Sequence, residues 1–274
     1  TKEGEVYVWK VKDLPPMKVE KYSPPQNERV PKVMFTPSEF SYEGNAGSGE
    51  NWQSIGNWLY SLIEGRNVPT PEMSALVERL TEGAEDDMEK IRRLYAYLGQ
   101  NTRYVSIQLG LGGLRPIAPE SVFKNKFGDC KALTLFLQTL LKSCGIESYY
   151  TVINMGADRM MPDFPSLATA NHVILSIPTA QDTLWVECTN PDVPLGYVHS
   201  EIAGNHALIV KKDGSYVTTL PKYPDSANRC DMKALVDLRA DGSASVMVSE
   251  CGRMDFWDSY YSLSRMNEVD KTNS

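Results

Sequence analysis

The spacing of apolar residues predicts helices in the middle of the chain. Between residues 51 and 144, apolar side chains recur every three or four positions, which is the period of helices that bury one face. The stretch 132–141 is apolar at most positions and indicates a buried helix. We expect helices at 51–62, 71–80, 86–100 and 130–144, with Asn51 capping the first and Pro71 in the first turn of the second.

After residue 148 the pattern changes to the two-residue alternation of strands, with turn residues between the apolar runs. We expect strands at 149–153, 172–177, 184–188, 207–210 and 216–220, and a hairpin of 232–238 with 244–248 around Asp241-Gly242. Before residue 48, short strand-like segments at 6–11 and 32–35 are separated by prolines.

Helices followed by strands indicate an α+β fold, with helices packed on an antiparallel sheet. We expect residues 1–48 to be the end of an N-terminal β domain and a linker, and residues 49–222 to be the central domain. Residues 223–274 are then the start of a C-terminal β domain that is cut short. Because the chain begins at Thr1 without an initiator Met, we expect it to be a piece of a longer protein.

Charge and composition exclude several classes of function. The chain has 274 residues and a net charge of −7, and it shows no cluster of Lys and Arg that could neutralise a nucleic acid backbone. Its longest apolar run falls well short of the roughly 20 residues that cross a bilayer. The cysteines and histidines lack metal-site spacing, and no helix opens directly after Gly110 to Gly113, as a nucleotide-binding loop requires. We therefore expect no nucleic acid partner, membrane span, metal or cofactor.

Cys130 stands at the first turn of the predicted apolar helix, after Gly128-Asp129. Unpaired N–H groups and the helix dipole favour an anion there, and the pKa of cysteines at such positions can fall from about 8.5 toward roughly 3.5–7.5. Cys130 is therefore a candidate nucleophile, although a free cysteine is more commonly a small core residue. We interpret Asp129 as the helix cap. Lys131 could stabilise a thiolate, but a lysine beside an apolar helix is more often a solvated surface charge, and we assign it no role.

A thiol nucleophile needs a base within hydrogen-bond reach and a third group that orients the base. Among the three histidines, His172 is the best placed, because it opens a predicted strand. Glu187 lies on the next strand along the chain. A hairpin with its centre at Thr179-Ala180 would put His172 and Glu187 opposite one another.

The order of these residues resembles the transglutaminase-like superfamily. The resemblance rests on Gly128-Asp129-Cys130, Asn171-His172-Val173 and Trp185-Val186-Glu187, and extends over roughly residues 50–222. It points to the bacterial branch in which this domain lies between two β-sandwich domains, and it favours the cell envelope or periplasm.

The resemblance implies a papain-like core with Cys130 as nucleophile, His172 as base and then acid, and Glu187 orienting the imidazole. Many members of the superfamily carry Asp at the position of Glu187. The backbone N–H of Cys130 is the natural first donor to an oxyanion, and Gln108 is a candidate second donor or substrate-binding residue.

These residues together predict a cysteine-dependent acyl-transfer enzyme that acts on amide or peptide bonds of a peptide or protein substrate. Water as acceptor gives peptidase or amidase action, and an amine gives transamidation. The alternative is a catalytically silent scaffold that binds or assembles proteins. We expect Cys144 and Cys188 to be packing residues, whereas Cys230 and Cys251 could form a disulfide across the predicted hairpin.

Overall fold

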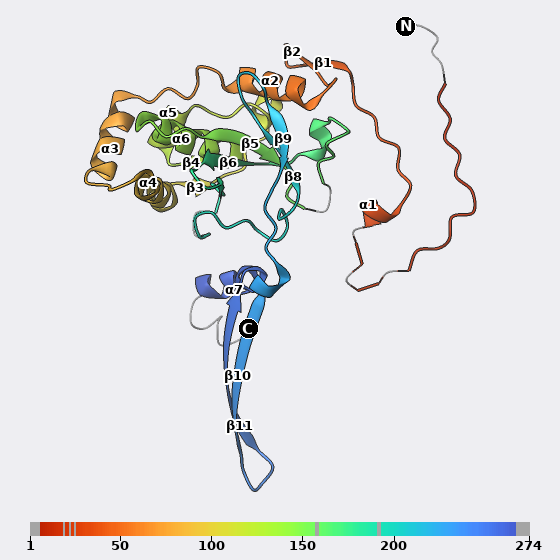
Figure 1. The fold of residues 1–274 in the computed structure, drawn as a ribbon, viewed down its shortest axis with the longest axis vertical. Coiled ribbons are helices and arrows are strands. Elements are labelled where there is room, and N and C mark those ends of the chain that lie inside the picture. The colour runs from red at the N-terminus through yellow and green to blue at the C-terminus, as the bar shows by residue number, and fades with distance from the viewer. Residues whose placement is uncertain are drawn as a thin grey trace. The chain divides into compact units, whose positions relative to one another are not determined.

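The computed structural model describes residues 6–18, 20–21, 23–24, 26–156, 159–190 and 193–266 (Figure 1). Contacts divide the chain into two units, Thr1–Met34 and Phe35–Ser274. The predicted strands at 6–11 and 32–35 are wrong. Most of these residues are exposed and no described strand runs beside them, so their backbone groups have no ladder to join. The predicted domain boundaries at residues 48 and 222 stay predictions.

The predicted helices of the middle of the chain are confirmed, and Asn51 caps the first of them as expected. Asn51 accepts a hydrogen bond from the Ser54 backbone N–H at 2.8 Å, and Asp86 accepts one from Glu89 at 2.7 Å. Among the described helices, none is long and apolar enough to cross a membrane. The helices are α1 (Gln26–Arg29), α2 (Trp52–Ile63), α3 (Pro71–Thr81), α4 (Asp87–Asn101), α5 (Pro119–Asn125), α6 (Cys130–Ser143) and α7 (Asp255–Arg265).

The central sheet contains the five strands predicted after residue 148, in the order β7-β6-β5-β8-β9, and every neighbouring pair is antiparallel. Its strands are β5 (Tyr149–Ile153), β6 (His172–Pro178), β7 (Thr183–Val186), β8 (His206–Ile209) and β9 (Tyr216–Thr219). Short pairs elsewhere are β1 (Glu39–Tyr42) with β2 (Asn45–Ser48), and β3 (Arg103–Tyr104) with β4 (Phe127–Gly128).

Helix α6 lies against one face of this sheet and is buried along most of its length (Figure 1). Leu175 and Ile177 of β6 belong to the same apolar cluster as Phe136 of α6. The opposite face, which includes Ile174 and Trp185, is covered by residues of the connections rather than by helices. The predicted α+β class, with helices on an antiparallel sheet, is confirmed.

Gly128 allows the chain to pass close to the first turn of α6. A Cβ atom at this position would lie 2.9 Å from the Ala132 Cβ and 3.4 Å from the Leu133 Cδ2. Because the Ala132 Cβ is fixed to the helix backbone, a side chain at residue 128 would displace the start of the helix. Glycine therefore helps to place Cys130, two residues later, at the beginning of α6.

The predicted C-terminal hairpin is confirmed as β10 (Arg229–Leu238) and β11 (Ala244–Arg253). The disulfide hypothesis is wrong, because both of its cysteines are free. Cys230 pairs with Gly252, and Cys251 pairs with Asp231, so the two thiols point to opposite faces of the hairpin. The two strands pair in a register shifted by one residue from the one that would place Cys230 opposite Cys251.

Apolar side chains gather on one face of the β10–β11 hairpin. The pairs Ala234↔Val248 and Val236↔Val246 share this face, and the alternation continues to Leu238. Val236, Leu238, Val246 and Val248 are each more than half exposed. This face therefore presents contiguous apolar surface among the residues that the structure describes.

Candidate active site

Cys130 is the first residue of α6, and its side chain is 5% exposed. Asp129 precedes it as the N-cap and accepts a hydrogen bond from the Ala132 backbone N–H at 3.0 Å. The predicted capping role of Asp129 is confirmed. Cys130 thus stands in the first turn of α6, where backbone N–H groups have no partner within the helix.

Lys131, to which the sequence assigned no role, is buried rather than solvated at the surface. Its Nζ lies 2.5 Å from the second carboxylate oxygen of Asp129, and both side chains are about 5% exposed. Asp129 therefore caps α6 and neutralises a buried lysine at the same time. An apolar helix pattern alone could not reveal this, because the partner lies on the cap rather than on the helix.

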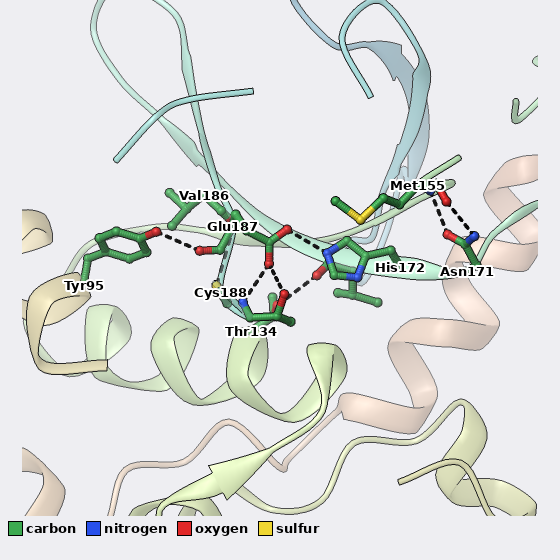
Figure 2. Close-up of polar contacts among 10 residues, drawn as sticks. Tyr95, Thr134, Met155, Asn171, His172, Val186, Glu187 and Cys188 are labelled. Carbon is green, nitrogen blue, oxygen red and sulfur yellow. Dashed lines mark hydrogen bonds and ion pairs between the residues drawn. The ribbon is translucent and has the colours of Figure 1, made fainter. Parts of the chain in front are cut away.

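Hydrogen bonds fix the backbone on both sides of His172 (Figure 2). The Asn171 side chain accepts from the Met155 backbone N–H at 2.7 Å and donates to the Met155 carbonyl at 2.9 Å. The Thr134 hydroxyl of α6 donates to the Val173 carbonyl at 3.3 Å. This last bond ties the helix that begins with Cys130 to the strand that begins with His172.

The His172 Nε2 lies 2.8 Å from the Glu187 Oε2 (Figure 2). The two residues are not directly opposite, as the expected hairpin centre required. Leu175 pairs with Val186, and continuing this register by one residue puts Glu187 opposite Ile174. His172 is the next residue on the same side of β6, so the contact is diagonal. The longer side chain of glutamate helps to span such a distance.

Thr189 holds the second carboxylate oxygen of Glu187. The Thr189 backbone N–H donates to Glu187 Oε1 at 2.7 Å, and the Thr189 hydroxyl donates to the same oxygen at 2.6 Å. The Tyr95 hydroxyl of α4 donates to the backbone carbonyls of Glu187 and Val193 at 3.0 and 3.1 Å. Sequence reasoning missed both residues. A hydroxyl two positions after a candidate carboxylate is the signal that could have found Thr189.

The contacts around the imidazole shift the pKa values of both His172 and Glu187. Burial acts to lower the pKa of His172, but side-chain hydrogen bonds with Cys130 and Glu187, together with the charge of Glu187, raise the pKa to about 10. Burial acts to raise the pKa of Glu187, but His172 and the Thr189 hydrogen bonds lower the pKa to about 2. At neutral pH, His172 is therefore an imidazolium and Glu187 a carboxylate.

A cavity of about 300 Å³ opens beside Cys130 and His172. Gln108 also lines this cavity, so the structure brings the four residues predicted for the site to one place. The Gln108 Nε2 donates to the Ser106 hydroxyl at 3.2 Å. None of the residues lining the cavity is an aspartate or glutamate; Glu187 contacts His172 but is not a lining residue.

The neighbouring thiols differ from Cys130 in their surroundings. Cys188 is completely buried, and burial together with the charge of Glu187 raises the pKa of its thiol. Burial also raises the pKa of Cys144, whose Sγ donates to the Leu141 carbonyl at 3.2 Å. Both environments disfavour a thiolate. Over the described ranges, no group of three or more His, Cys, Asp or Glu side chains is arranged to hold a metal ion.

Replacing Thr189 by valine is expected to lower the pH at which His172 loses its proton. The variant keeps the backbone N–H but removes the hydroxyl that holds the Glu187 carboxylate, so the carboxylate supports the imidazolium less well. NMR titration of the His172 ring measures the shift, and Thr189→Ser should restore the wild-type midpoint. Equal midpoints for the valine variant and the wild type would contradict a positioning role for the hydroxyl.

The fold and the site define the class of the protein: an α+β cysteine-enzyme fold, in which a thiol at a helix start faces an imidazole bonded to a carboxylate. Residues 74–199 match the family model described as the transglutaminase-like superfamily. This part of the chain is therefore similar to the transglutaminase-like superfamily, and the predicted resemblance is confirmed. No curated protein matches the sequence.

Solved structures also resemble the chain. One is a candidate protease from Parabacteroides distasonis, at 12% sequence identity and a TM-score of 0.52, and the match covers 87% of this chain and 45% of that one. Another is a candidate cysteine protease from Cytophaga hutchinsonii, at 12% identity and a TM-score of 0.37, with 70% and 54% covered. A third is the periplasmic domain of TgpA from Pseudomonas aeruginosa, at 15% identity and a TM-score of 0.35, with 55% and 52% covered. The chain thus spans about half the length of each of these three structures.

Proposed function

We propose that the chain is a cysteine-dependent acyl-transfer enzyme acting on amide or peptide bonds, with Cys130, His172 and Glu187 as its triad. The observation that carries the proposal is the arrangement of His172, which contacts Glu187 at 2.8 Å and lines the same cavity as Cys130. A purely structural histidine needs neither a thiol at a helix start nor an adjoining cavity.

In the first half-reaction, the Cys130 sulfur attacks the carbonyl carbon of the substrate and forms an Sγ–C bond. The carbonyl oxygen then carries a negative charge, which the Cys130 backbone N–H and the Gln108 side-chain amide would bind as hydrogen-bond donors. The presence of Gln108 in the wall of the same cavity supports this second role.

His172 then donates its proton to the leaving nitrogen, the C–N bond breaks, and an amine leaves behind a thioester on Cys130. The raised pKa of His172 supports this role, because the imidazole already carries the proton at neutral pH. In the second half-reaction, water or an amine attacks the thioester while His172 accepts its proton. The Sγ–C bond breaks, and the sulfur returns to its starting state.

Glu187 remains ionised throughout and keeps the Nε2 side of the imidazole occupied, which leaves the other ring nitrogen for the proton transfers. Its lowered pKa and its two hydrogen bonds from Thr189 support this role. The 2.8 Å contact supports glutamate in the role for which many members of the superfamily carry aspartate.

Trapping the acyl-enzyme tests the proposal. We expect a p-nitrophenyl ester of an N-acetylated amino acid to increase the intact mass of the protein by one acyl group, with the adduct mapping to Cys130. Hydroxylamine at neutral pH should remove the adduct, as it does from a thioester, and an added primary amine would distinguish transamidation from hydrolysis by its product. An adduct on other residues only, or none, would count against the proposal.

A further inference from the structure

A second cavity adjoins the cavity of Cys130. Its volume is about 250 Å³, and it lies between the β1–β2 hairpin, helix α2 and the segment 166–168. The two cavities share Leu114 and Leu167 as wall residues. A ligand that extends from the thiol past these two leucines would therefore enter the second cavity.

The second cavity is built for an apolar group. Phe40 packs edge-on against Trp58, with ring centroids 5.0 Å apart, and the Trp58 indole N–H is already bonded to the Asn45 carbonyl at 3.3 Å. Four aromatic residues and two leucines are among the residues that line it, and none of the lining residues is charged. A lysine, arginine or carboxylate side chain would lose its hydration there without gaining a partner.

We propose that this cavity is a specificity subsite that takes a large apolar or aromatic side chain of the acyl part of the substrate. The inference rests on the proposed function, because it places the reacting carbonyl at Cys130. The acyl part is the portion that stays bound through both half-reactions, so an anchor for it acts in each of them. The preferred substrates are then peptides or amides with a residue such as Phe or Leu shortly before the bond that is broken.

Peptidyl chloromethyl ketones provide a test in which the Cys130 sulfur forms a bond to the methylene carbon and chloride leaves. We would compare Phe, Gly, Lys and Asp at each of the two positions before the ketone and measure second-order inactivation rates. Phe at one of these positions is expected to react at least about tenfold faster than Gly there, because its ring is buried in the subsite.

Ala168 offers a variant that changes only the subsite. It is an exposed residue that lines the second cavity but not the first. Ala168→Trp, or the milder Ala168→Leu, should fill the subsite and bring the ratio of Phe to Gly rates close to one, with folding checked by circular dichroism. Ala75→Trp, at an exposed alanine of α3, is the matched control and should keep the ratio.

The outcomes distinguish a failure of the subsite proposal alone from a failure of the proposed acyl-transfer function. Labelling of Cys130 at equal rates by all probes, or fastest labelling by the Lys or Asp probes, overturns the subsite and leaves the acyl-transfer proposal standing. A Phe preference that persists in both Ala168 variants also overturns the subsite. If neither the ketones nor the ester of the acyl-enzyme experiment modifies Cys130, the proposed function and the subsite fail together.

Discussion

Replacing Cys130 with alanine is expected to abolish turnover and to remove the fastest-alkylating thiol of the chain. Loss of the nucleophile costs on the order of 10⁶ in kcat in a well-studied triad hydrolase, because the covalent intermediate can no longer form. Iodoacetamide at mildly acidic pH is the direct probe, since the imidazolium of His172 adjoins the Cys130 sulfur. Peptide mapping should find Cys130 modified first in the wild type.

The remaining cysteines provide the controls for this experiment. Cys251 is exposed, so Cys251→Ser is the appropriate background for measuring intact mass. Cys144→Ala removes a half-buried thiol at the other end of the same helix and should leave turnover and the labelling of Cys130 in place. If Cys130→Ala retained turnover, or if Cys144 were alkylated before Cys130, the thiol would not be the nucleophile.

Glu187→Gln is expected to cause the second large loss of turnover. Glutamine keeps the size of the side chain but removes the charge that supports the imidazolium, so the pKa of His172 should fall. A comparable change in another triad enzyme lowers kcat by about 10⁴, and we expect a loss on the order of 10²–10⁴ here. Glu78→Gln, at an exposed carboxylate of α3, is the matched control. Unchanged turnover together with an unchanged His172 titration would exclude an orienting role for Glu187.

The same variant has a defined dependence of stability on pH. The pKa of His172 is raised to about 10, so its contribution is complete below its ordinary pKa of about 6.5 and is lost as the pH rises toward 10. The pKa of Glu187 is lowered to about 2, so its contribution is complete above about 4.5 and is lost as the pH falls toward 2. The difference in unfolding free energy between wild type and Glu187→Gln should therefore be largest between about pH 4.5 and 6.5.

The helices and the position of the thiol could be predicted because their causes are local. Caps such as Asn51 and Asp129, and the three- or four-residue apolar period, act within a few residues along the chain. The pairing of His172 with Glu187 was predicted from a hairpin between neighbouring strands, whereas their approach to Cys130 was predicted only through the superfamily resemblance. Nothing in the apolar pattern brings a helix start to the beginning of a strand.

The parts that sequence reasoning missed depend on register and on tertiary contacts. Glu187 is a diagonal rather than a direct neighbour of His172, and Cys230 lies one pairing position away from Cys251, because each hairpin centre differs from the one expected. Tyr95 reaches the Glu187 carbonyl from α4, far away in the sequence. Contacts of this kind follow from packing, for which the spacing of residues carries no signal.

The apolar face of the β10–β11 hairpin has a consequence for the behaviour of the chain in solution. A two-stranded hairpin alone is at best marginally stable in water, and a flat apolar face on it favours self-association. Colloidal stability in buffer should therefore be governed by Val236, Val246 and their neighbours rather than by the catalytic region. Salts such as sulfate, which strengthen the burial of apolar surface, should promote precipitation through this face.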